Sequence, residues 1–238
     1  MRGFWVWGMA MLMALAWPAA GAETSQRYDV YAGGLKIGTL GLDGRVSGSR
    51  YAASGRVAGG GLIGVFVTFD FSGTSQGSIE GGRLRPEAYE ARSDDGKTAR
   101  TTRMRYQGGR PVSVTFDPER KPRDYDAAAS GQAGTLDPIA ATFALLAEAP
   151  VGAACGRSVE VYDGRRRSRL TVAPRQAGRD GTFVCDGTYT RVDGFSDKLM
   201  AERQTFPFTL IFRETAGVMQ VVRFETQTTF GRVSAIRR

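Results

Sequence analysis

The chain of 238 residues contains 32 Lys and Arg, 24 Asp and Glu, two Cys and no His. The absence of His excludes Ser-His and Cys-His catalytic pairs and every His metal ligand, and two Cys are too few for a four-Cys zinc site. A hydrophobic fraction of 42% with a charged fraction of 24% is typical of a globular protein. We therefore expect no bound metal and no cofactor.

The first 22 residues have the pattern of a secretory signal peptide, with an apolar run over residues 4–17 and small side chains at Ala20 and Ala22. The run is shorter than the roughly 20 residues of a membrane-spanning helix, and Pro18 interrupts it. We predict cleavage before Glu23, export to the periplasm, and a mature chain without a transmembrane segment. An exported protein seldom meets nucleic acid, so the net charge of +8 is not interpreted as a nucleic-acid-binding signal.

Residues 27–117 predict a succession of β-strands separated by turns that are rich in Gly. The clearest alternation runs through 62–74, where Phe66 and Asp70 point to one face. Gly within strands, as at Gly41 and Gly73, indicates bulges or bends of a curved sheet. The expected strands are 27–32, 35–46, 51–57, 62–74, 84–92, 98–106 and 112–116.

A surface loop is expected over 117–134, followed by the one convincing helix, at about 138–148. Asp137 can cap this helix, and Pro138 suits its first position. Ile139, Phe143 and Leu146 share one face, which we expect to pack on the sheet.

Strands return after the helix, and Cys155 and Cys185 fall before and within them. In an oxidising compartment these two residues are expected to form a structural disulfide worth roughly 3–4 kcal/mol, because their spacing is unlike Cys-x-x-Cys. The sequence thus predicts a single mainly β domain over 23–238. Its curved antiparallel sheet should form a barrel or half-barrel with one helix packed on it. The later expected strands are 158–162, 168–173, 182–191, 205–214, 218–227 and 232–236.

Carboxylates are the main candidates for catalysis, and most have a structural role available. Only Asp70, within a strand, lacks such a role, and an outward-facing position explains it as well. Ser196 and Lys198 are of the residue types of a Ser-Lys nucleophile pair, but their surroundings predict a loop. We assign no catalytic residue and leave catalysis open. The carboxylates with structural roles are Asp117, Asp137, Asp163 and Asp193.

Candidate ligand-binding residues come from two places. Alternation on the 158–173 hairpin would send Arg165, Arg167 and Arg169 to one face, where they could hold an anionic lipid headgroup or a glycan phosphate. A solvated hairpin tip is the alternative. A helix over a concave sheet also leaves an apolar groove. Phe66, Asp70 and Phe143 are the candidates to line it, unless the groove is a filled core.

The short motifs resemble the domain-of-unknown-function 3108 family of exported bacterial proteins. These motifs are YDVY at 28–31, GLKIG at 34–38 and GRLRPEAY at 82–89, and VYDGRRR at 161–167 between the two Cys is similar to the proteobacterial branch. The resemblance implies a β-rich protein of the Gram-negative envelope and provides no catalytic residues. The expected architecture is also similar to that of periplasmic half-barrel lipoprotein carriers, which is an analogy of fold alone.

The sequence therefore favours a non-catalytic periplasmic binding protein that holds a lipid or another amphipathic ligand in the concavity of its sheet. One alternative is a carboxylate-dependent hydrolase of an envelope glycan, which needs two carboxylates about 5–10 Å apart in a cleft. Another is a structural envelope protein that contacts its partner through the hairpin at Arg165. Nothing in the sequence specifies the oligomeric state.

Overall fold

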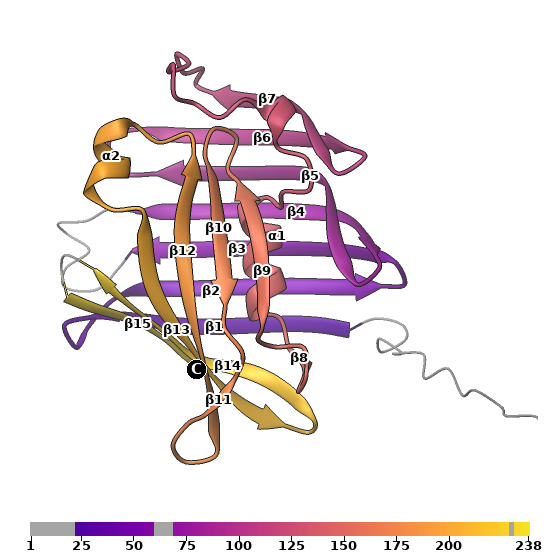
Figure 1. Cartoon of the computed structure of the whole chain (residues 1–238), viewed down its shortest axis with the longest axis vertical. Helices are drawn as coiled ribbons and strands as arrows, with labels where there is room; N and C mark the ends of the chain where they lie inside the picture. The colour runs from indigo at the N-terminus through magenta and orange to yellow at the C-terminus, as the bar shows by residue number, and fades with distance from the viewer. Residues whose placement is uncertain (1–21, 60–68, 229–230) are drawn as a thin grey trace, which may run out of the picture.

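The computed structural model describes residues 22–59, 69–228 and 231–238, and it is mainly β (Figure 1). Two α-helices accompany the strands, α1 (Pro138–Leu146) and α2 (Asp197–Glu202), with a 3-10 turn at Ala129–Gly131. The strands are β1 (Ala22–Ala32), β2 (Leu35–Ser47), β3 (Arg50–Gly59), β4 (Asp70–Glu80), β5 (Arg83–Asp94), β6 (Ala99–Gln107), β7 (Arg110–Asp117), β8 (Ala149–Pro150), β9 (Arg157–Tyr162), β10 (Arg167–Val172), β11 (Gln176–Ala177), β12 (Thr182–Asp193), β13 (Thr205–Thr215), β14 (Val218–Thr228) and β15 (Gly231–Arg237).

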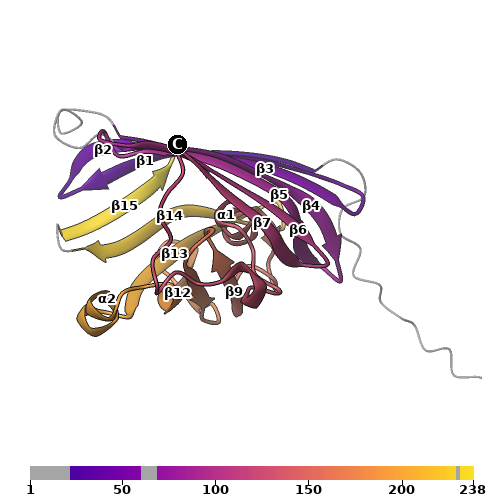
Figure 2. The ribbon, with the colours of Figure 1, turned by 90° about the horizontal axis from the view of Figure 1, so that it is seen from above.

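All these strands belong to one sheet, in the order β7-β6-β5-β4-β3-β2-β1-β15-β14-β13-β12-β10-β9, with β8 on β14 and β11 on β12. The pairing of the first strand with the last joins two halves, β1–β7 and β9–β15. The halves cross in Figure 1 and form two layers in Figure 2. The sheet does not close, because β7 and β9 remain its two edges. The predicted antiparallel half-barrel is confirmed.

The segment between β7 and α1 covers parts of both sheet edges. Gly134 donates its backbone N–H to the carbonyl oxygen of Gly109, beside β7, at 2.8 Å. Leu136 donates to the Glu160 oxygen of β9 and accepts from Tyr162, both at 2.8 Å. These bonds satisfy backbone groups that an open sheet would otherwise expose. The loop predicted for this segment therefore has a structural role, which is to bridge the open sheet.

Helix α1 begins as the sequence predicts. The Asp137 carboxylate accepts a hydrogen bond from the backbone of Ala140 at 2.9 Å, and Pro138 occupies the first turn. Ser75 of β4 donates to the other Asp137 oxygen at 2.6 Å, and its hydroxyl lies 3.0 Å from that of Tyr51. This buried polar chain links the start of α1 to the sheet.

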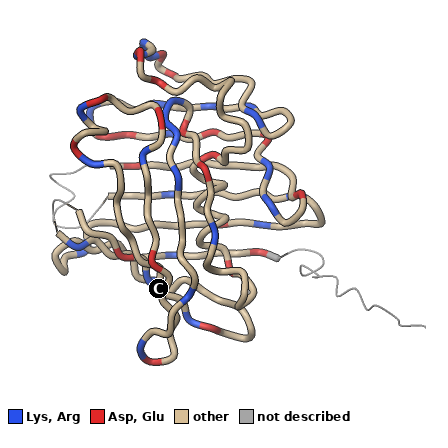
Figure 3. Tube along the Cα trace, in the orientation of Figure 1, with Lys and Arg blue, Asp and Glu red and all other residues tan. Residues whose placement is uncertain are grey.

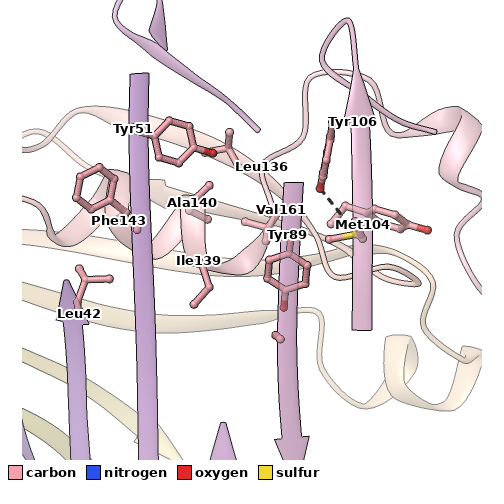
Figure 4. Close-up of a cluster of buried hydrophobic side chains, with 14 of the residues drawn as sticks. Leu42, Tyr51, Tyr89, Met104, Tyr106, Leu136, Ile139, Ala140, Phe143 and Val161 are labelled. Carbon is pink, nitrogen blue, oxygen red and sulfur yellow. Dashed lines mark hydrogen bonds between the residues drawn. The ribbon is translucent and has the colours of Figure 1, made fainter. Parts of the chain in front are cut away.

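The helix lies between the two layers (Figure 2). Ile139 and Phe143 are buried against β1–β7, as expected, and the Phe143 ring stacks on Tyr51 with the ring centroids 6.3 Å apart (Figure 4). Leu145 is buried in a second cluster, with side chains of β12, β13 and β14. The helix therefore packs on more than the single face that the sequence predicts, because both layers of one folded sheet enclose it.

Helix α1 packs closely on glycines of the inner face of the sheet, Gly44, Gly55 and Gly73, which we call the seat of α1. A Cβ atom at Gly44 would lie 2.2 Å from the Phe143 ring, and one at Gly55 would lie 2.8 Å from Ile139. A Cβ atom at Gly73 would lie 2.9 Å from the Cβ atom of Ala91 on β5 and 3.2 Å from the same isoleucine. The neighbouring strand and the helix together thus leave no room for a side chain at this glycine.

The structure differs from the sequence-based expectation at β4 and at α2. The strand predicted at 62–74 is observed only from Asp70, where β4 begins and continues to Glu80, and residues 60–68 lie outside the described residues. The loop predicted around Ser196 and Lys198 is wrong, because Ser196 caps the short helix α2 with a bond from Leu199. The capping hydroxyl is therefore accounted for structurally.

The predicted disulfide between Cys155 and Cys185 is present, with a Cα–Cα distance of 6.2 Å. Cys185 lies fully buried in β12, and Cys155 lies in the connection between β8 and β9. The bond ties the chain that follows α1 to the second layer of the sheet.

Candidate binding face

Phe143, one of the two aromatic residues expected to line a concavity, is not at an open site. Phe143 of α1 is only 5% exposed, because it packs against Gly44 of the sheet, as described above. Phe66 lies outside the described residues. The inner face of β1–β6 around α1 is thus occupied by packed side chains, which include Leu42, Tyr89 and Met104 (Figure 4).

Asp70 lies at the start of β4, half exposed, with an oxygen 3.5 Å from the Arg56 guanidinium of β3. It belongs to the face of the sheet that is turned away from α1, because its neighbour Phe71 packs against the core cluster. Asp70 and Phe143 therefore lie on opposite faces of the sheet.

Of the three arginines expected to act together, the structure brings Arg167 and Arg169 onto one partner. Arg167 and Arg169 both bind Glu160 across the β9–β10 pair, the first at 2.9 Å. Burial acts to raise the pKa of the Glu160 carboxyl, but the hydrogen bonds from these arginines hold that pKa below its usual value. Arg165 lies in the turn, where its burial and the nearby charge of Arg166 lower its guanidinium pKa.

Three of the remaining candidate carboxylates have structural partners. Asp163 accepts hydrogen bonds from the backbone of Arg165 and Arg166, and Asp193 accepts one from Gly194. Burial raises the pKa of Asp137 to about 7, but this carboxyl is fully enclosed and caps α1. Across residues 22–59, 69–228 and 231–238, no three Cys, Asp or Glu side chains gather closely enough to hold a metal ion.

Surface hollows are found instead on the outer face of β1–β6, which we define as the face turned away from α1. Strand alternation and register place three rows of side chains there, each running across all six strands. The first row is Arg27, Gly41, Arg56, Ser72, Arg92 and Thr101. The middle row is Ser25, Asp43, Ser54, Thr74, Glu90 and Arg103. The third row is Glu23, Arg45, Ala52, Gln76, Ala88 and Arg105.

Two shallow grooves occupy this outer face, with volumes of about 530 Å³ and about 730 Å³. Both are lined by the same four members of the middle row, so the grooves meet along that row. The first groove extends to the first row, and the second extends to the third row. The shared residues are Asp43, Ser54, Thr74 and Glu90.

Ion pairs fix the two ends of the middle row. Arg27 holds Asp43 through two bonds of 2.9 and 3.0 Å, and Arg103 holds Glu90 at 3.0 Å. The hydrogen bonds from Arg27 also hold the pKa of Asp43 below its usual range. Between these pairs the floor is formed by the hydroxyl side chains of Ser54 and Thr74.

The grooves also contain arginines that have no acidic partner among the described residues. Arg92 of the first row and Arg45 and Arg105 of the third row are exposed and take part in no ion pair within the described ranges. Together the two grooves are lined by seven arginines and three acidic residues, so the face is cationic. Figure 3 shows that basic and acidic positions are otherwise spread over both halves of the sheet.

The sequence analysis missed this face, although part of its signal was available. Polar side chains recur two positions apart in successive strands, as in Asp43 and Arg45 or Glu90 and Arg92. This spacing predicts a polar outer face for each strand. The register between strands, which aligns the residues into rows, comes only from the structure.

Comparisons with known proteins agree with the fold. The sequence profile of the family described as "Protein of unknown function (DUF3108)" matches residues 27–235. A solved structure titled "Crystal Structure of Beta-barrel-like Protein of Domain of Unknown Function DUF1849 from Brucella abortus" is similar, with a TM-score of 0.50 and 13% identity. The similarity covers 90% of this chain and 95% of that one. No curated protein matches the sequence.

No helix in the described part of the chain is both long enough and apolar enough to cross a membrane. The family profile spans both halves of the sheet, the helix between them and the outer face with its grooves. The chain belongs to the DUF3108 family of proteins of unknown function.

Proposed function

We propose that this chain is a non-catalytic binding protein of the bacterial cell envelope, and that its ligand lies along the outer face of β1–β6. The observation that carries this proposal is the pair of grooves that meet along the middle row. Large hollows that carry a few directed polar groups are the usual places for ligands. The export signal expected in the first 22 residues supports the cellular location.

The chemistry of the grooves favours binding over hydrolysis. Asp43 and Glu90 are the carboxylates common to both grooves, and three strand spacings separate them, about 14 Å along the sheet. Paired carboxylates in a glycosidase lie closer, at about 5–10 Å. Arginines hold both residues, and the hydrogen bonds from Arg27 keep the pKa of Asp43 below its usual range, which opposes a role of Asp43 as general acid.

A substitution that fills the grooves tests the proposal. Ser54→Glu places a longer, acidic side chain where the two cationic grooves meet, and Thr171→Glu makes the same change of charge at an exposed position of β10. The three proteins are purified gently from the native compartment and weighed by native mass spectrometry. We expect a retained ligand on the wild type and on Thr171→Glu, and its loss from Ser54→Glu. Retention by Ser54→Glu would contradict the proposal.

A lipid in the concavity is the second candidate, and the seat of α1 favours it. If the helix left this seat, it would uncover an apolar trough lined by Leu42, Ala53 and Ala91. Among the described residues, three direct hydrogen bonds from sheet side chains reach the helix or its cap: from Ser75 to Asp137, from Gln26 to the Leu146 carbonyl and from Arg157 to the Leu145 carbonyl. Uptake of a fluorescent fatty acid with loss of protection of the α1 amides against hydrogen exchange would support this candidate. Uptake without that loss would contradict it.

A further inference from the structure

We propose that the outer face of β1–β6 binds a linear anionic polysaccharide, which runs across the strands along the middle row. This inference rests on the proposed function and names the ligand class of the same grooves. It follows from the length of the grooved face, from the unpaired arginines on both of its sides, and from the polar floor between them.

The length of the face fits a chain better than a single small anion. The middle row crosses six strands, from Ser25 on β1 to Arg103 on β6. Five strand spacings amount to about 24 Å. The grooves meet along this row, so a ligand that fills both must extend across several strands.

The charges of the face fit repeated anionic groups. Arg92 lies on one side of the middle row, and Arg45 and Arg105 lie on the other side, each exposed and free of an ion pair within the described ranges. The guanidinium group can bind a carboxylate through two parallel hydrogen bonds. Three such groups, on the two sides of the row that both grooves share, suit a ligand that carries acidic groups along its length.

The floor of the face fits sugar hydroxyl groups. Ser54 and Thr74 present hydroxyls that can donate and accept hydrogen bonds, and the Asp43 and Glu90 carboxylates can accept additional ones. Arg27 and Arg103 engage these two carboxylates in ion pairs. A polyhydroxylated chain with acidic groups uses both the floor and the flanking arginines.

The same rows do not fit insertion into a bilayer. None of their side chains is apolar and larger than Ala. A protein surface that enters a membrane interface normally carries large apolar side chains beside its basic ones. The exposed large apolar residues of the described chain lie outside the three rows, at Leu35, Phe69 and Val112. Binding to an anionic membrane surface is the alternative that the test distinguishes from binding of a polysaccharide.

The test measures fluorescence anisotropy of labelled oligogalacturonate, a linear polyuronate, with the full mature chain. Malto-oligosaccharide of equal length provides the neutral control, and phosphatidylglycerol vesicles provide the membrane control. We expect saturable binding of oligogalacturonate that strengthens with oligomer length and weakens with added salt. Binding to the neutral oligomer or to the vesicles alone would overturn the proposal, and so would the absence of oligogalacturonate binding.

Two triple variants distinguish specific binding at this face from a general attraction between opposite charges. Arg45→Gln, Arg92→Gln and Arg105→Gln together should weaken oligogalacturonate binding about tenfold or more. The control replaces Arg179, Arg213 and Arg232 by Gln, which makes the same change of net charge at exposed arginines outside the rows. It should weaken binding by less than about twofold. Equal losses in the two variants would overturn the proposal, and their melting temperatures show that both remain folded.

The outcomes distinguish the ligand class from the binding function. If oligogalacturonate fails to bind but Ser54→Glu still loses a copurified ligand, the polysaccharide inference is wrong and the proposed function stands. If Ser54→Glu retains its copurified ligand, the proposed function itself is wrong.

Discussion

The seat of α1 allows a sharp prediction, which is that Gly44→Ala destabilises the protein by overpacking. The new Cβ would lie 2.2 Å from Cε2 of Phe143, 2.8 Å from Cδ2 and 2.9 Å from Cζ. Carbon atoms in contact normally lie about 3.5–4.0 Å apart, so the ring has to move. The ring stacks on Tyr51 and is buried between two layers, which leaves it little room.

Overpacking of this kind costs about 1–3 kcal/mol. For a chain of this size, each kcal/mol lowers the melting temperature by roughly 2–4 °C. We therefore expect Gly44→Ala to lower the melting temperature by about 2–12 °C in a thermal scan followed by circular dichroism. Gly41→Ala is the matched control on the outer face of the same strand, where the nearest atom to the new Cβ is Cδ of Arg27, at 3.5 Å. It should change stability by less than about 0.5 kcal/mol.

A double variant checks the cause. In Gly44→Ala with Phe143→Leu, the smaller side chain leaves room for the added methyl group. The two losses should then be less than additive, with a coupling energy of about 1 kcal/mol or more. Additive losses, or equal losses for the Gly44 and Gly41 variants, would refute the packing of α1 on its glycine seat.

Three further predictions concern stability. Because burial raises the Asp137 pKa to about 7, above its value near 4 in the unfolded chain, the fold should lose up to about 4 kcal/mol as pH rises from 4 to 7. Asp137→Asn, which can still cap α1, should flatten this part of the pH profile in urea titrations, and an unchanged slope would contradict the assignment. Replacing Cys155 and Cys185 by Ser should cost about 3–4 kcal/mol, and a reductant should then have no further effect on the melting temperature. Glu160→Gln removes the partner of two arginines on β10 and should cost about 1 kcal/mol in the same titrations, and no loss would show that these ion pairs contribute nothing.

Much of the fold could be predicted from the sequence because its signals are local. Alternation within strands, the turns, the Asp137 cap and the helix near 138–148 each depend on neighbouring residues. The way the sheet folds into two layers around α1 depends on contacts far apart in the sequence, such as that between Phe143 and Gly44. For this reason the sequence indicates a curved sheet with one helix but not a helix buried on both sides.

The candidate site was harder to predict for the same reason. The arginines of the 158–173 hairpin stand out because they are adjacent in sequence, yet Glu160 engages two of them. Arg45, Arg92 and Arg105 lie on three separate strands, and only the strand register brings them to the rims of the same grooves. A cluster assembled by register leaves no compact motif in the sequence.

We propose that ligand binds on the outer face of β1–β6 while the inner face stays packed around α1. A residue-resolved NMR titration with oligogalacturonate distinguishes the two faces when it is followed through the Nε–Hε signals of the arginines and the ring signals of Phe143. We expect shifts for Arg45, Arg92 and Arg105 and none for the Phe143 ring. Shifts confined to Phe143 and the neighbouring core, with the three arginine signals unchanged, would contradict it.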